Sequence, residues 1–216
     1  MKRVALISTF LFLAAVLPAQ AEPTAKYTVT FDGTWSKETH PLDFPFLAHF
    51  SGLIGATHND GYAIFVEEGT ATDGLEHLCE MGKHSPLDAE ITKAVQAGTV
   101  GVLFESKDPI RPVPGKASAT FTIDEKHPMV SLVAMIAPSP DWFAGVSNVN
   151  LLENGQWVKE KTLTLYAWDG GTDDGTSYRS LDKDRRPKGK VQMSRSAHFM
   201  KDGQPNPVGS VTFVKQ

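Results

Sequence analysis

Apolar and polar residues alternate in several stretches of the chain, and this alternation limits the possible fold more than any other feature. Residues 27–31 carry apolar side chains at odd positions and polar ones at even positions, and the same period returns over residues 117–123. A period of two places successive side chains on opposite faces of a β-strand, one buried and one solvated. Residues 129–137 are almost continuously apolar, as in a central strand covered on both faces. Further strands are expected over residues 157–168 and 210–214.

Helical patterns occur in one part of the chain only, between about Asp73 and Gly98. A first helix is expected over residues 73–81. A second begins at Ser85-Pro86, where Ser85 caps the helix and the proline occupies its first turn. Many short strands on both sides of one helical segment predict an all-β fold, an antiparallel β-sandwich with a short helical insertion.

Three shorter segments complete the expected organisation. Residues 62–66 predict a short apolar strand. The glycine-rich residues 48–59 predict packed, irregular backbone more than a regular strand. The charged residues 182–190 predict a solvated loop.

The start of the chain has the three parts of a secretory signal peptide. Met1-Lys2-Arg3 is basic, residues 4–17 are apolar, and Ala19-Gln20-Ala21 provides an Ala-x-Ala exit. The apolar run is shorter than the ~20 residues that a membrane-spanning helix needs, and no later segment approaches that length. The sequence therefore predicts a signal peptide at residues 1–21, no transmembrane segment, and an exported product that is periplasmic or secreted.

Cleavage after Ala21 can be tested directly. Mass spectrometry of the exported protein should find an amino terminus at or near Glu22, because the Ala-x-Ala motif ends at Ala21. A mature protein that still begins at Met1 would contradict this prediction.

Charge and cysteine content exclude some classes of function. The formal net charge is −4, and loss of Lys2 and Arg3 makes it −6. A mildly acidic chain without a basic block is a poor nucleic-acid binder. The single cysteine, Cys79, permits no internal disulfide and lies in a helical apolar pattern, which indicates a buried hydrophobic residue more than a reactive thiol. A lone thiol after a signal peptide points to a bacterial periplasm, with full secretion left open.

The most distinctive polar segment is Asp169-Gly170-Gly171-Thr172-Asp173-Asp174-Gly175, which directly follows an expected strand. Carboxylates this close repel one another unless water or a cation lies between them. Glycines let the backbone turn tightly enough to aim several oxygens inward. Calcium takes about six to eight oxygen ligands and tolerates irregular loops, so this composition suits Ca2+ better than zinc or magnesium. The alternative is a solvated acidic turn without a metal.

A second candidate is Asp141, which follows Pro138-Ser139-Pro140 where the most apolar strand leaves the core. Trp142 and Phe143 are expected to wall one side of this carboxylate and to lower the local dielectric constant. An aspartate in such surroundings is costly to ionise without a partner, and a neighbouring cation would offset that cost. The alternative is that Asp141 caps its own turn through its side chain.

Together these segments resemble the spondin domain, the amino-terminal module of F-spondin and mindin, which is also found in exported bacterial proteins. The Ser-Pro-Asp-Trp and Asp-x-Gly-Thr-Asp motifs, in this order and at this separation, make the resemblance specific. It extends from about Tyr27 to the last expected strand, so residues 22–216 are assigned to one such domain. The matching segments are residues 48–59, 74–76, 138–146 and 169–175.

The resemblance implies a C2-like antiparallel β-sandwich with a calcium ion at one end. It implies that the ion is held by the aspartate of the Ser-Pro-Asp-Trp motif and by acidic residues of the Asp-x-Gly-Thr-Asp loop. Those positions match Asp141, Asp169 and Asp173 in this chain.

The chain departs from the family pattern at one expected ligand. An animal member offers a glutamate from the strand before the apolar one, and the position that aligns with it here is Thr122. Asp124 and Glu125 lie close by in the sequence and are candidates to replace it. The cysteines of the animal proteins are also missing.

Catalysis has no positive sign in the sequence. His49 and His58 lie in glycine-rich, apolar surroundings that favour structural histidines over zinc ligands. No His-Glu-x-x-His motif, no Gly-x-Ser-x-Gly elbow and no phosphate-binding loop occurs.

The first hypothesis is therefore a non-enzymatic, calcium-stabilised recognition or adhesion module whose partner is an unknown protein or envelope component. In animals the resemblance implies matrix and cell-surface recognition, including integrins, and those partners are not carried over to this chain. The alternative is a metal-dependent hydrolase that uses the same acidic loop with His49 or His58 as the base; its metal needs an open position for water or substrate. A third possibility is a structural envelope component with no ligand besides calcium.

Overall fold

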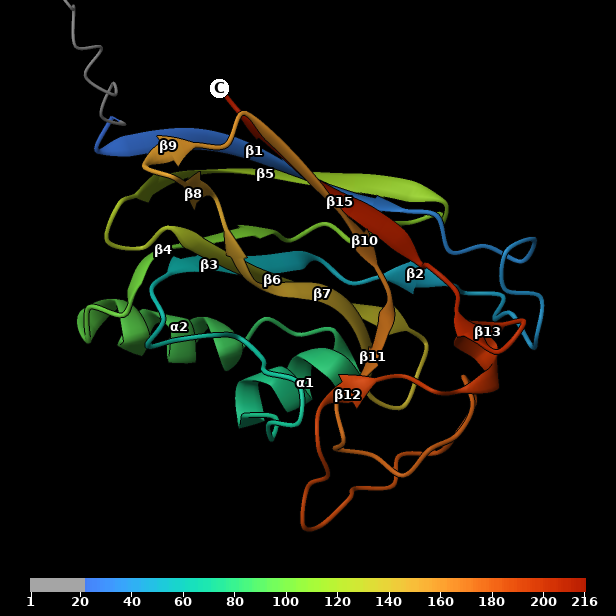
Figure 1. Cartoon of the computed structure of the whole chain (residues 1–216). Coiled ribbons are helices and arrows are strands. Elements are labelled where there is room, and N and C mark those ends of the chain that lie inside the picture. The colour runs from blue at the N-terminus through green and yellow to red at the C-terminus, as the bar shows by residue number, and fades with distance from the viewer. Residues whose placement is uncertain (1–21) are drawn as a thin grey trace, which may run out of the picture.

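Two antiparallel β-sheets face each other and enclose the main apolar core (Figure 1). The structure is a computed structural model that describes residues 22–216, so the expected signal peptide at residues 1–21 lies outside the described residues. Two short helices lie together in the sequence between strands of the larger sheet. This architecture confirms the predicted all-β sandwich with a helical insertion.

The four-stranded sheet contains both ends of the described chain. Its strand order is β10-β15-β1-β5, and every neighbouring pair is antiparallel. The strands are β1 (Thr24–Gly33), β5 (Gly115–Asp124), β10 (Glu160–Leu165) and β15 (Gly209–Lys215).

The seven-stranded sheet carries the helices on its outer face. Its order is β12-β11-β7-β6-β3-β4, and β2 also pairs with β6. The strands are β2 (His49–Phe50), β3 (Leu53–His58), β4 (Val100–Ser106), β6 (Met129–Ala137), β7 (Trp142–Asn150), β11 (Ala167–Asp169) and β12 (Gln192–Met193). Two small hairpins, β8 (Leu152–Glu153) with β9 (Gln156–Trp157) and β13 (Met200–Lys201) with β14 (Gln204–Pro205), and a 3-10 turn at Ala197–Phe199 complete the fold.

Strand β1 shows how the alternation builds the core. Tyr27, Val29 and Phe31 are buried, whereas the threonines between them lie on the outer face. Tyr27 stacks on Phe121 of β5 with ring centroids 6.0 Å apart, and Phe31 meets Phe50 of β2 edge to face at 5.0 Å. Burying each such side chain stabilises the fold by roughly 1.5–3 kcal/mol.

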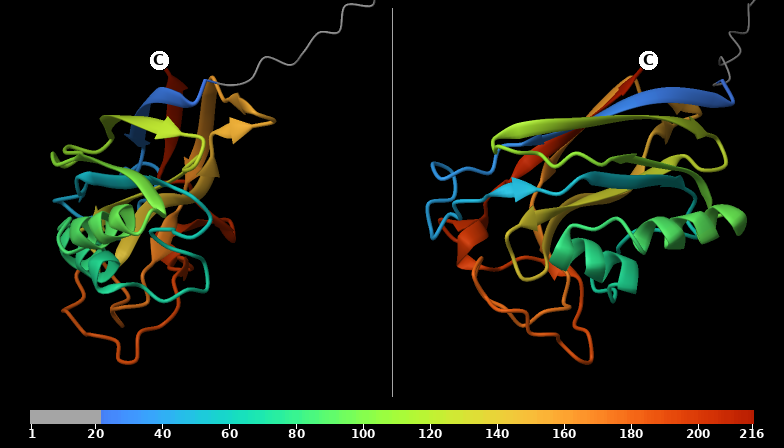
Figure 2. Two further views of the ribbon diagram at one scale, coloured as in Figure 1. Left: turned by 90° about the vertical axis from the view of Figure 1, so that its left-hand side faces the viewer. Right: turned by 180° about the vertical axis from the view of Figure 1, so that it is seen from behind.

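Strand β6 is buried on both faces, as its continuous apolar sequence predicts. Leu132 and Ala134 face the main core between the sheets. Val133 faces the opposite way, into a second apolar cluster beneath the helices. The two further views in Figure 2 show the resulting layers: the four-stranded sheet, the seven-stranded sheet, and then the helices.

Helix α1 (Asp73–Met81) confirms the first predicted helix. The hydroxyl of Thr72 caps its start by accepting a hydrogen bond from the Leu75 amide at 3.1 Å. Gly82 ends it with φ of +66°, a left-handed conformation that favours glycine. Cys79 on this helix is buried against the sheet, and burial raises the pKa of its thiol well above the usual range. The prediction of a buried hydrophobic cysteine is confirmed.

Helix α2 (Leu87–Gln96) confirms the second predicted helix but not its cap. Pro86 occupies the capping position, and no side chain caps the helix there, so the assignment of Ser85 as the cap is wrong. Asp88 in the first turn instead accepts from the Ala89 amide at 2.7 Å. A carboxylate at the positive end of the helix macrodipole is favourable in this position.

Two local predictions are wrong because side-chain packing decides the backbone. Residues 48–59 form mostly regular strand, where Gly55 leaves room for the Phe104 ring of the neighbouring β4; an added Cβ would lie 2.4 Å from that ring. Residues 62–66 form no strand. Their apolar side chains cover the sheet instead, and the Phe65 ring packs 5.0 Å from that of Phe143.

The alternation does not predict strands β4 and β7. The single strand expected over residues 157–168 is wrong, because this segment contributes to β9, β10 and β11, which belong to three different sheets. Among residues 22–216, no helix combines the length and the apolar character needed to cross a membrane.

Candidate metal centre

Asp141 lies in the turn between β6 and β7, at one end of the seven-stranded sheet. Ser139 shapes this turn: its Oγ accepts from the Trp142 amide at 3.1 Å, and its hydroxyl donates to the Trp142 carbonyl at 3.3 Å. The Asp141 side chain is only 1 % exposed and bonds to a different segment of the chain. The alternative that Asp141 caps its own turn therefore does not hold.

Trp142 and Phe143 do not wall the same side of Asp141. They are successive residues of β7, so their side chains point to opposite faces of the sheet. Trp142 enters the core between the sheets and meets Tyr178 edge to face at 5.4 Å. Phe143 enters the cluster beneath the helices.

Strand pairing brings the two predicted acidic segments together. In the register between β7 and β11, Asp169 lies opposite Trp142 and thus next to Asp141. The backbone continues this contact, because the Gly170 amide donates to the Asp141 carbonyl at 3.1 Å. Gly171 then turns the chain with φ of +70°, and a Cβ at this position would lie 2.8 Å from the backbone of Gly189.

The Asp141 carboxylate is satisfied on one oxygen only. Its Oδ2 accepts from the backbone amides of Thr172 at 2.8 Å and Asp173 at 3.2 Å. Its Oδ1 is buried and has no hydrogen-bond partner within residues 22–216. A buried carboxylate oxygen without a donor is the kind of group that a bound cation satisfies.

Electrostatics give the same indication. Burial and, to a smaller extent, the charge of Asp169 together raise the pKa of Asp141 to about 7, against the effect of the two backbone amides. Burial also raises the pKa of Asp169, opposed by the Gly171 amide and by Arg185. A divalent cation would stabilise both ionised carboxylates, so the two residues fit a calcium ion.

Asp173 is buried in the same loop, but its carboxylate already has two donors. Its Oδ1 accepts from the Gly175 amide at 2.5 Å and its Oδ2 from the Lys183 amide at 2.6 Å. Each oxygen keeps a further lone pair for a metal. The neighbouring Asp174 is exposed and lies 3.6 Å from Lys183 and 3.8 Å from Arg185.

The three aspartates are neighbours without being tightly gathered. In the described residues, the acidic, histidine or cysteine side chains whose ligand atoms all lie within 4.8 Å of one another are Glu76, Glu80 and Asp184. A calcium ion held by Asp141, Asp169 and Asp173 would therefore draw their carboxylates closer together. This ligand set stays a prediction.

The candidates for an additional acidic ligand lie at the wrong end of the sandwich. Asp124 pairs with Thr24 at the start of β1. The candidate centre lies near the other end of β1. Tyr178, which contacts Trp142 next to Asp141, packs 5.6 Å from Trp35, and Trp35 follows the end of β1. Asp124, and with it Glu125, is therefore separated from the centre by the length of β1, roughly 30 Å at ~3.4 Å per residue.

The two histidines of the hydrolase hypothesis lie in different places. His58 pairs with Met129 at the far end of β6, and its Nε2 lies 2.8 Å from the Ser131 hydroxyl. His49 pairs with Ala137 at the near end of β6, and its Nδ1 lies 2.7 Å from the Leu47 carbonyl. Only His49 is thus at the same end of β6 as Asp141.

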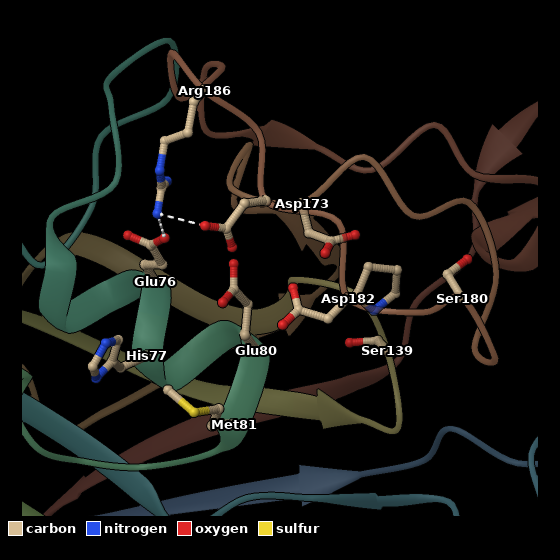
Figure 3. Close-up of a pocket in the computed structure, with 11 residues that line it drawn as sticks. Glu76, His77, Glu80, Met81, Ser139, Asp173, Ser180, Asp182 and Arg186 are labelled. Atoms are coloured by element: carbon tan, nitrogen blue, oxygen red, sulfur yellow. Dashed lines mark hydrogen bonds and ion pairs between the residues drawn. The ribbon is translucent and has the colours of Figure 1, made fainter.

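Sequence reasoning missed an acidic cavity beside the centre. A cavity of about 440 Å³ lies between α1 and the loop after Asp173. Glu80 and Asp182 point into it (Figure 3). Glu76 lies on the same helix and is buried, with its two carboxylate oxygens 2.7 Å from Arg186 and 2.6 Å from Lys188. No local pattern signals these pairs, because their partners are separated by more than a hundred residues.

Two of these ion-pair partners, Arg186 and Lys188, belong to the charged segment 182–190. It is a loop, as predicted, but it is fastened to α1 rather than fully solvated. Lys188 is largely buried and also bonds to Asp73 at 2.8 Å and to the Ala71 carbonyl at 3.1 Å.

Replacing Lys188 by methionine should lower the free energy of unfolding by roughly 2 kcal/mol, the scale of a hydrogen bond to a charged group. Glu76 would lose one of its two cationic partners and stay buried. Urea denaturation measures the change. Lys183→Met is the matched control: its ammonium is exposed and 3.6 Å from Asp174, so about 0.5 kcal/mol or less is expected. Equal effects of the two substitutions would contradict the anchoring role.

The Spondin_N family model matches residues 25–205, which is most of the chain and includes all three aspartates. The chain belongs to the spondin N-terminal domain family. The resemblance predicted from the motifs is thereby confirmed.

Individual members of the spondin family show the same relationship. The chain is 34% identical over 185 residues to Spondin-1 of Homo sapiens, covering 82% of this chain and 23% of Spondin-1. It is 31% identical over 208 residues to Spondin-2 of Rattus norvegicus, covering 90% of this chain and 63% of Spondin-2. The chain thus spans under a quarter of the length of Spondin-1.

Proposed function

We propose that this spondin N-terminal domain is an exported, non-enzymatic recognition or adhesion module whose acid-rich end is stabilised by calcium. The single observation that carries the calcium part is the Asp141 carboxylate: it is buried, it lies beside Asp169, and its Oδ1 has no donor. Family membership supports an exported, non-enzymatic role, in the periplasm or outside the cell.

The chain would hold the ion between two segments that are far apart in sequence. Asp141 comes from the β6–β7 turn, and Asp169 and Asp173 come from the loop after β11. Bound calcium would supply positive charge that neutralises these carboxylates. The residues themselves fix the geometry: the amides of Thr172 and Asp173 orient Asp141, and the Gly171 amide holds Asp169 at 2.9 Å.

Recognition is tested by capture from envelope extract. The tagged mature domain, residues 22–216, is immobilised in calcium or in chelator, with Asp169→Asn as the matched control. A recognition module should retain an envelope component in calcium, and retain less of it in chelator or with the variant. Equal recovery in all three arms, or none in any, would contradict calcium-dependent recognition. Isothermal titration calorimetry of the same protein tests calcium binding independently.

A further inference from the structure

Thr172 occupies a special place in the candidate centre. It is fully buried in the loop after β11, and its backbone amide donates to Oδ2 of Asp141 at 2.8 Å. Its hydroxyl oxygen lies 3.4 Å from the same Oδ2. Its carbonyl accepts from the Arg185 amide at 2.7 Å, which ties the residue to the far side of the loop.

The donors around Asp141 are strongly asymmetric. The Thr172 amide, the Thr172 hydroxyl and the Asp173 amide all point to Oδ2, and no donor of residues 22–216 reaches Oδ1. A carboxylate held in this way cannot rotate about its terminal bond without losing these hydrogen bonds. Its Oδ1 is thus kept in one direction and is available to a cation.

A second carboxyl group, that of Glu80, lies near the Thr172 hydroxyl. Burial raises the pKa of the Glu80 carboxyl on α1, and the neighbouring Thr172 hydroxyl opposes that effect. A hydroxyl carries one proton, so it can donate to Asp141 or to Glu80 but not fully to both. If the hydroxyl donates to Asp141, it orients a ligand of the proposed centre. If it donates to Glu80, it does not.

We propose that Thr172 is a positioning residue of the metal centre, whose hydroxyl and amide together hold Oδ2 of Asp141 so that Oδ1 is presented to the cation. This inference rests on the proposed calcium site. Groups that orient metal ligands without touching the metal typically change its affinity when they are removed.

Two substitutions separate positioning from simple filling of space. Thr172→Val keeps the shape of the side chain and removes the hydroxyl. Thr172→Ser keeps the hydroxyl and removes the methyl group. A packing role predicts that valine is tolerated and serine is harmful, whereas positioning predicts the reverse. Thr176→Val is the matched control, because Thr176 is an exposed threonine of the same loop.

The experiment measures the dissociation constant for calcium by isothermal titration calorimetry on residues 22–216. Terbium luminescence, excited through Trp142 beside Asp141, provides a second readout of the loaded centre. Thr172→Val should weaken calcium binding about tenfold, while Thr172→Ser and Thr176→Val should stay within about twofold of the unmodified domain, a difference under about 0.5 kcal/mol by the tenfold-per-1.4 kcal/mol relation.

The outcomes distinguish this inference from the proposed function. If the unmodified domain binds calcium and Thr172→Val binds it equally well, the hydroxyl serves Glu80 or packing alone and the inference is overturned. Weak binding by Thr172→Ser with normal binding by Thr172→Val would overturn it in favour of packing. If the unmodified domain binds neither calcium nor terbium, the proposed calcium site itself is wrong.

Discussion

Removing calcium should lower the free energy of unfolding by about 2.7 kcal/mol when the ion had been present at a hundred times its dissociation constant. The reason is that the proposed site exists only where the fold brings Asp141 and Asp169 together, so the ion would bind the folded state alone. For a domain of this size the melting temperature should fall by roughly 5–10 °C. Differential scanning calorimetry in calcium and in chelator measures the shift. An identical transition in both buffers would mean that the segment 169–175 is a solvated turn.

Variants of the loop sharpen this result. Asp169→Asn and Asp173→Asn should each abolish most of the difference between calcium and chelator. Asp173→Asn should also be less stable in both buffers, because its carboxylate holds the amides of Gly175 and Lys183. Asp174→Asn is the control, since Asp174 is exposed and contacts two exposed basic side chains loosely. It should keep the full calcium-dependent shift.

In calcium-free buffer the domain should lose stability as the pH rises from about 4 to about 7. The pKa of Asp141 is about 7 in the folded state against 3.8 in the unfolded chain. Between these values the folded state holds a proton that the unfolded state has released, so raising the pH favours unfolding. The contribution of this one group amounts to at most roughly 4 kcal/mol across the window. Saturating calcium should remove the fall.

Asp141→Asn isolates this contribution. An asparagine can still accept the amides of Thr172 and Asp173 through its side-chain oxygen, but it does not titrate. Urea denaturation at several pH values between 4 and 8 gives the difference between the two proteins. Other groups, such as the buried His58, whose pKa burial lowers, titrate in both and cancel. A constant difference across the window would contradict a raised pKa at Asp141.

Much of the fold could be predicted because the alternation reports burial directly. In β1 and β6 the apolar positions of the sequence are the buried positions of the structure. The prediction failed where a buried apolar segment does not pair with a neighbouring strand. Phe65 is apolar because it covers Phe143, not because residues 62–66 form a strand. The alternation does not predict strand β7, because its successive residues Trp142 and Phe143 are both apolar. Each packs in a different apolar cluster, on opposite faces of the sheet.

The candidate centre could be predicted in part. The motifs indicated Asp141 and the loop from Asp169, and strand register now explains why they are adjacent. The buried pairing of Glu76 with Arg186 and Lys188 could not be predicted. Such pairs depend on where a long loop returns to the helix. A charged segment has the same sequence pattern whether its side chains are solvated or form ion pairs with a helix.

The burial of Cys79 also bears on how the chain matures. The thiolate is the species that attacks disulfides, and a thiol with a strongly raised pKa and no exposed surface supplies almost none of it. Once folded, the domain therefore has almost no thiolate available for thiol–disulfide exchange, even in an oxidising compartment. With one cysteine the chain forms no internal disulfide, so its fold needs no disulfide chemistry, and the buried thiol disfavours cross-linking of two folded copies through sulfur. Any oxidation of Cys79 would mark molecules in which α1 has left the sheet.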